Sequence, residues 1–164
     1  MKALARRLVP GVAGLAAVVA GVVLLGRVPS GPRPLRYGVD ACAECRMHLT
    51  RPGFGGELRD ADGRLTTYDD VGCLLRAMLK RHGAMPEAWV EDHAGGGFVS
   101  LLAAHLVRAP EAETPMGHGI VAFRDEAAAD AFAAAAGGTR VALEDLVRDL
   151  TRVASAAGHA KENR

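Results

Sequence analysis

Residues 42–48 read CAECRMH and bring two thiols, a thioether and an imidazole into one short stretch. Cys42 and Cys45 are three residues apart, so a turn can point both thiols at one object. Cys45 and Met47 are two apart, and an extended chain after Cys45 would place both side chains on one face. A thiolate beside a thioether is a soft ligand pair that selects Cu(I) over Mg²⁺, Ca²⁺ or Mn²⁺. The spacing therefore predicts a copper site.

Three other readings of the cysteine pair stay open. Zinc usually takes four nitrogen or sulfur ligands, and no second C-x-x-C follows. A thioredoxin-like redox pair usually opens a helix, whereas Pro52 and three nearby glycines follow here. The third reading is a disulfide staple, either Cys42–Cys45 or Cys42–Cys73. Because the chain has only three cysteines, at least one of them stays outside any pairing within the chain.

A second sulfur-bearing stretch, TPMGHG, places Met116 and His118 two residues apart in a Pro/Gly-rich loop before a strand. If this loop faces the cysteine segment, one Cu(I) could take Cys and Met from one side and Met and His from the other. The alternative is that Met116 packs into the core and that His118 is an ordinary surface residue. Cys73 is a third candidate ligand, a disulfide partner for Cys42, or an inert thiol. It lies in the first turn of a predicted helix, away from the apolar stripe.

The pattern of strands and helices predicts an α+β fold with two small ββαβ units in tandem behind an N-terminal hydrophobic helix. Asp62-Gly63 marks a tight turn between two strands. Asp69 or Asp70 caps the first helix, and Asp125 caps an Ala-rich second helix. We expect five segments: 1–27 as signal or membrane anchor, 28–36 as an extended Pro/Gly linker, 37–96 and 97–154 as the two units, and 155–164 as a flexible tail.

Leu8 to Leu25 is an uncharged run of about the length of a membrane span. We expect it to act as an uncleaved anchor, with a cleaved signal peptide as the alternative. The preceding basic residues would stay in the cytoplasm, which places the body on the periplasmic side of the inner membrane. Residues 37–164 carry 14 basic and 19 acidic side chains, a net charge of −5 that argues against nucleic acid as a partner.

The cysteine segment, TYDDVGC at the start of a helix and PMGHGIVAF together resemble the NosL family, the copper chaperones of nitrous oxide reductase maturation. The resemblance runs from about Tyr37 to about Leu146. It implies a Cu(I) carrier and no enzymatic activity. The implied partners are nitrous oxide reductase or another copper enzyme and a membrane transporter complex of the same assembly pathway. The candidate metal ligands are Cys42, Cys45, Met47, Met116 and His118.

The chain departs from the usual family pattern at two places. Many members carry a lipid-anchoring cysteine, which the hydrophobic N-terminus here lacks. Many also have Gly between the second Cys and Met, where this chain has Arg46. No nucleophile elbow, P-loop or dinucleotide fingerprint occurs in the sequence. A periplasmic thiol-disulfide oxidoreductase that uses Cys42 and Cys45 is the alternative function.

Overall fold

The computed structural model describes residues 31–81 and 86–162. Residues Pro32–Arg164 form one compact body, which contains all the elements below. The predicted anchor, Leu8 to Leu25, lies outside the described residues. Within the described ranges, none of the helices has the length and apolar character that a membrane span requires.

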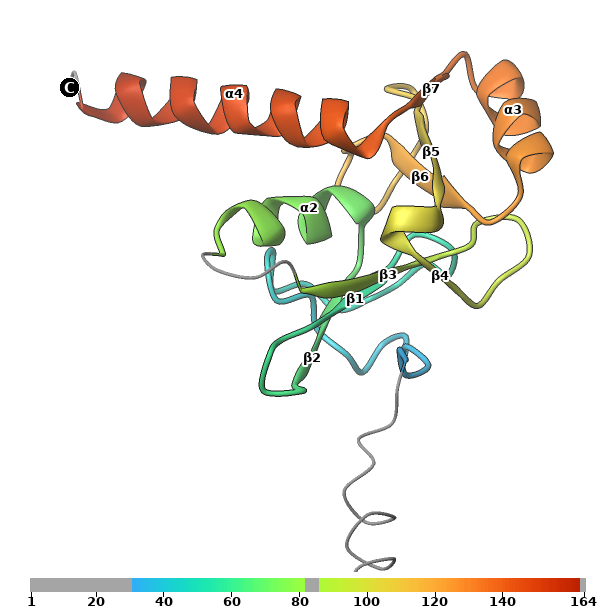
Figure 1. The fold of residues 1–164 in the computed structure, drawn as a ribbon, viewed down its shortest axis with the longest axis horizontal. Helices are drawn as coiled ribbons and strands as arrows, with labels where there is room; N and C mark the ends of the chain where they lie inside the picture. Colours follow the sequence, from blue (N-terminus) through green and yellow to red (C-terminus); the bar gives the residue numbers. More distant parts are fainter. Residues whose placement is uncertain (1–30, 82–85, 163–164) are drawn as a thin grey trace, which may run out of the picture. The chain divides into compact units, whose positions relative to one another are not determined.

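The first sheet is antiparallel and has four strands in the order β2-β1-β3-β4 (Figure 1). Its first two strands form the predicted hairpin, with Gly63 at a φ of 83° in the turn, a backbone conformation that glycine adopts without strain. The central strand β1 pairs with β2 and β3 on its two sides. The strands are β1 (Gly56–Arg59), β2 (Leu65–Tyr68), β3 (Glu87–Glu91) and β4 (Phe98–Ser100).

The second sheet is also antiparallel and has three strands in the order β6-β5-β7. Helix α3 packs against it and begins at Asp125, whose carboxylate accepts a hydrogen bond from the Ala128 amide at 2.9 Å. The elements are β5 (His105–Arg108), β6 (Ile120–Phe123), α3 (Glu126–Ala135) and β7 (Thr139–Val141).

The order of elements confirms the α+β prediction, because both β1-β2-α2-β3 and β5-β6-α3-β7 follow the ββαβ order. Strand β4 falls in the range expected for the second unit, yet it pairs with β3 and extends the first sheet. A short 3₁₀ helix, η1 (Leu101–Ala103), then leads into β5.

Helix α2 (Val71–Leu79) packs against the first sheet on one side and contacts α4 and β6 on another (Figure 1). Six of its nine residues are buried, more than one amphipathic stripe supplies, because neighbours cover it on more than one side. Helix α4 (Leu143–Glu162) continues through most of the range predicted to be a flexible tail.

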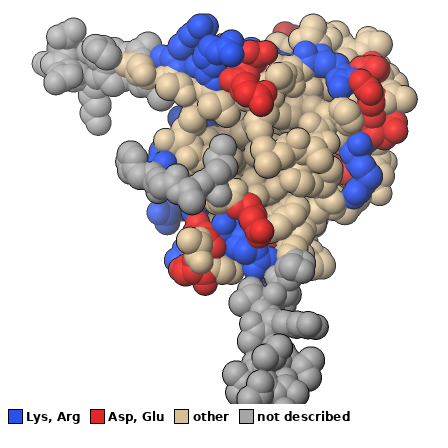
Figure 2. Space-filling model, in the orientation of Figure 1, with Lys and Arg blue, Asp and Glu red and all other residues tan. Residues whose placement is uncertain are grey.

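Two apolar clusters hold the body together. The larger lies around α2 and includes Leu58, Leu74 and Leu146, all fully buried. The smaller lies under α3, where Phe54, Phe123 and Phe132 surround the His93 ring with centroid distances of 4.8 to 5.6 Å. Three of the seven aromatic residues of the chain therefore lie around this one histidine. On the face in Figure 2, basic and acidic side chains are interspersed around an uncharged centre.

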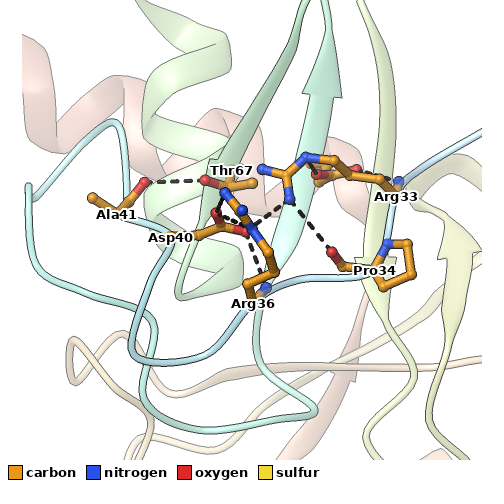
Figure 3. A network of polar contacts seen from close by, with 7 residues as sticks. Arg33, Pro34, Arg36, Asp40, Ala41 and Thr67 are labelled. Carbon is orange, nitrogen blue, oxygen red and sulfur yellow. Dashed lines mark hydrogen bonds and ion pairs between the residues drawn. The ribbon is translucent and has the colours of Figure 1, made fainter.

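Ion pairs cross-link the segment before the cysteines, and hydrogen bonds attach it to the rest of the body (Figure 3). Asp40 is buried, and its carboxylate accepts hydrogen bonds from Arg33 Nη1 at 2.8 Å and Arg36 Nη2 at 2.7 Å. The Arg33 amide donates to Glu57 Oε2 at 2.8 Å. Burial works to raise the pKa of Asp40, but the hydrogen bonds from the two arginines outweigh it and hold the pKa well below its usual range.

We predict that Asp40→Asn lowers the free energy of unfolding by about 1 to 3 kcal/mol at pH 7, since it removes the charge that two partly exposed arginines share. Because the pKa of Asp40 is lowered in the folded state, its contribution is present above pH 4 and declines as the pH falls further. Urea denaturation at pH 7 and pH 3 measures both effects. Asp149→Asn, which breaks a more exposed pair with Arg108, is the control and should cost less than about 1 kcal/mol. If Asp40→Asn and Asp149→Asn lowered the free energy of unfolding equally, the stabilising role given to Asp40 would be wrong.

Candidate metal centre

The CAECRMH segment forms a narrow loop that presents its side chains to different surroundings. The Cys42 amide donates to the Met47 carbonyl at 2.8 Å, and the Arg46 amide donates to the Cys42 carbonyl at 2.9 Å. Arg46 closes the turn with a φ of 70°, the single positive φ among the described non-glycine residues. As a result Cys42 is buried, Cys45 is half-buried and Met47 is 55% exposed.

Three thiols and one carboxylate meet beside this loop. The ligand atoms of Cys42, Cys45, Asp69 and Cys73 all lie within 4.8 Å of one another, and we call these four residues the thiol cluster. Cys45 Sγ lies 3.6 Å from Asp69 Oδ1 and 3.7 Å from Oδ2. All three cysteines are free thiols. The cluster thus joins the loop, the end of β2 and the first turn of α2.

The close packing of these groups perturbs their ionisation. A hydrogen bond from Cys73 lowers the pKa of the Cys42 thiol, and the same bond raises the pKa of Cys73. Burial raises the pKa of Cys45 to about 11. Burial also raises the pKa of Asp69 to about 6, assisted by the charge on Cys42. The cluster therefore ionises first at Cys42, and Asp69 and the other two thiols lose their protons at a higher pH than such groups usually do.

The neighbouring carboxylate, Asp70, faces the other way and has no exposed surface. Its Oδ1 accepts hydrogen bonds from the Gly72 amide at 2.7 Å and from His118 Nδ1 at 2.9 Å. Its Oδ2 accepts from the Met116 amide at 3.2 Å. Burial works to raise the pKa of Asp70, but the hydrogen bonds from His118 and Thr114 outweigh it and keep the pKa below its usual value. Asp70 is thus both the cap of α2 and the attachment point of the TPMGHG loop.

The structure divides the predicted ligands between two adjacent places. Cys42 and Cys45 lie in the thiol cluster. Met116 and His118 are hydrogen-bonded to Asp70, the residue that follows Asp69 of the cluster. Met116 is partly buried and packs against the same apolar cluster as Cys45. Both loops therefore meet at the start of α2, and the full ligand set remains a prediction.

Two residues of the thiol cluster, Cys73 and Asp69, lie outside the ligand set that the family resemblance implies. Cys73 was a possible third ligand, but its angle on the helix indicated a residue away from the core, and it is instead 1% exposed. The residues around Cys42 cover that side of α2, which helix periodicity alone does not reveal. The sequence predicts Asp69 only as a possible helix cap. Only one of two consecutive acids can occupy the N-cap position. The second acid therefore needs another role, and this is the signal in the sequence that points to Asp69.

We predict that Asp69→Asn stabilises the metal-free protein at pH 7.5 by about 1 to 3 kcal/mol, given about 1.4 kcal/mol for each pKa unit. The folded state holds the Asp69 proton up to about pH 6, whereas an unfolded Asp releases it near pH 4. The stability of the parent chain should therefore fall between pH 4 and pH 7, and that of the variant should fall less.

Denaturant unfolding across this pH range, with a reductant and a chelator present, provides the measurement. Asp62→Asn removes the same charge from an exposed turn and serves as the control. A gain of stability in Asp69→Asn that is equal at pH 4 and pH 7.5 would show that the charge of Asp69 is not the cause.

Comparisons with known proteins agree with this geometry. Residues 37–151 match the family model NosL. No curated protein matches the chain. Among solved structures, the crystal structure of the copper chaperone NosL from Shewanella denitrificans is similar, with a TM-score of 0.64 and 21% sequence identity. The match covers 71% of this chain and 95% of the Shewanella chain.

At this level of identity the structural likeness establishes the fold, while the family match spans most of the body, including both loops at the metal centre. The resemblance noted from CAECRM and PMGHG is therefore confirmed by independent comparisons of sequence and of structure. The chain belongs to the NosL family.

Proposed function

We propose that this protein is a Cu(I) chaperone that binds one copper ion at the start of α2 and passes it to a copper enzyme. The observation that carries the proposal is the thiol cluster, in which three free cysteines and Asp69 place their ligand atoms within 4.8 Å of one another. Packing alone does not explain this cluster, because burying a carboxylate beside a thiolate costs free energy. A bound cation would remove that cost.

The donor types favour Cu(I) as the cargo. Thiolates suit both Cu(I) and Zn²⁺, but thioethers are ligands for soft ions. Met47 follows Cys45 by two residues and is exposed, and Met116 lies on the neighbouring loop. The proposed ligands remain Cys42, Cys45, Met47, Met116 and His118, to which the thiol cluster adds Cys73.

The graded exposure of the ligands suits a carrier. Cys42 and Cys73 are buried, Cys45 is half-buried and Met47 is exposed. An incoming ligand of a partner could bind Cu(I) from the Met47 side before the bond to Cys45 breaks, so the ion never passes through water as a free species. Because thiols must lose a proton to bind copper, affinity should fall as the pH is lowered.

The place of action follows from the N-terminal apolar run. We propose that it anchors the body to the periplasmic side of the inner membrane, where nitrous oxide reductase or another copper enzyme receives the ion with help from a membrane transporter complex. Protease added to intact spheroplasts should digest the body if this placement is right. Protection from the protease, with digestion only after lysis, would contradict it.

The alternative, a thiol-disulfide oxidoreductase, is less well supported by the geometry. Cys42 has no exposed surface, and the segment after Cys45 forms a loop. The thiol in the first turn of a helix is Cys73, which is buried too. An attacking thiolate in this enzyme class needs access to its substrate. Turnover in an insulin-reduction assay that depends on Cys42 would favour the enzyme over the carrier.

We predict that the full-length chain in detergent binds about one Cu(I) anaerobically, and that Cys45→Ser and Met116→Leu each weaken binding by at least about tenfold, or 1.4 kcal/mol. Competition with a chromophoric Cu(I) chelator measures the affinity, and X-ray absorption at the copper edge counts the sulfur neighbours.

Met78→Leu is the matched control, because it removes a thioether that packs against the same apolar cluster from the last turn of α2. Its copper affinity should equal that of the parent chain. Full affinity in both Cys45→Ser and Met116→Leu would refute the site.

A further inference from the structure

Asp70 makes more hydrogen bonds than a helix cap needs. The equivalent cap of α3, Asp125, accepts one side-chain bond from the Ala128 amide. Asp70 accepts from the Gly72 amide in its own helix and, in addition, from the Met116 amide and from His118. Two residues of the TPMGHG loop are therefore held by one buried carboxylate that comes from the other ββαβ unit.

The bond to Asp70 sets the proton position on the His118 ring. An ionised carboxylate has only lone pairs to offer, so His118 Nδ1 must donate the hydrogen in the 2.9 Å contact. In a neutral imidazole the other nitrogen, Nε2, then carries a free lone pair. This is the arrangement in which histidines usually bind metals in proteins, with the second ring nitrogen held by a carboxylate.

The ring is also fixed in place by packing. A Cβ atom at Gly72 would lie 2.3 Å from His118 Cγ and 2.6 Å from Nδ1, so the ring lies directly against the glycine at the start of α2. The His118 side chain keeps 19% of its surface exposed. Gly72 directly precedes Cys73 of the thiol cluster, so the ring is held beside the helical turn that carries that thiol.

We propose that Asp70 is a positioning residue that holds His118 in the Nδ1–H tautomer, so that Nε2 is the nitrogen offered to the metal. Asp70 touches no metal in this arrangement and acts through the ring and through the Met116 amide. The identity of the ion rests on the proposed function. The tautomer and the attachment of the loop are properties of the metal-free chain and can be tested without copper.

The test uses the full-length chain in detergent, labelled with ¹⁵N in histidine, reduced and free of metal at pH 8. Two-bond ¹⁵N–¹H correlations distinguish the two neutral tautomers, and His118→Gln identifies the signal. We expect Nδ1–H for His118. On addition of one equivalent of Cu(I), the Nε2 resonance should shift strongly while Nδ1 keeps its proton. An Nε2–H tautomer in the parent chain would overturn the proposal.

Asp70→Ser separates the two roles of this residue, because serine still caps a helix but is too short to reach the loop. In this variant the Nδ1–H tautomer should be lost, and Cu(I) affinity should fall by about 10- to 100-fold. Asp125→Ser makes the same change at the cap of α3 and should alter neither readout. Asp70→Asn keeps the size of the side chain and an oxygen that can accept from His118 Nδ1, so this conservative variant should retain the Nδ1–H tautomer.

The outcomes distinguish this inference from the proposed function. Loss of the tautomer in Asp70→Ser with unchanged Cu(I) affinity would overturn the positioning role. A chain that shows the Nδ1–H tautomer and loses it in Asp70→Ser, yet binds no Cu(I), would support the role of Asp70 in the loop and refute the chaperone function.

Discussion

The buried carboxylate of Asp70 is the contact on which the metal centre depends. It caps α2 through the Gly72 amide and holds the second loop through the Met116 amide and His118 Nδ1. A charge with no exposed surface is tolerated only when its lone pairs are filled, and here donors from two units fill them. The same bonds that stabilise the helix start therefore bring the two sulfur-bearing loops to one place.

The two consecutive acids at the start of α2, Asp69 and Asp70, contact different groups. Asp70 turns toward the second unit, and Asp69 turns toward the thiols of Cys42, Cys45 and Cys73. The second unit has the same strand, acid and helix order around Asp125, but its cap shows a single side-chain bond to the helix. The repeat thus gives two similar scaffolds, of which only the first carries the thiol cluster.

A carrier must combine a well-defined site with an accessible ion. Rigidity comes from α2, which the first sheet, β6 and α4 surround. Access comes from the exposed side of the CAECRMH loop, where Met47 lies in solvent. Ion pairs from Arg33 and Arg36 to Asp40 stiffen the preceding segment, and the contacts of Arg33 with Glu57 bind it to the first sheet, so the loop starts from a fixed point two residues before Cys42.

The sequence by itself determined the parts whose causes are local. The two ββαβ units, the Asp62-Gly63 turn and the caps at Asp70 and Asp125 follow from periodicity, turn chemistry and hydrogen bonds between near neighbours, and the motifs were sufficient to indicate the family. Only the tertiary structure decided which side chains meet. From helix periodicity alone, Cys73 is expected to lie away from the core, and Asp69 is expected only to cap the helix. Neither local pattern includes contacts with the CAECRMH loop, which packs against the start of α2 from 24 or more residues earlier in the chain. The pairing of β4 with β3 and the burial of Asp70 beneath His118 also depend on residues distant in sequence, and their energies arise only once the two units pack together.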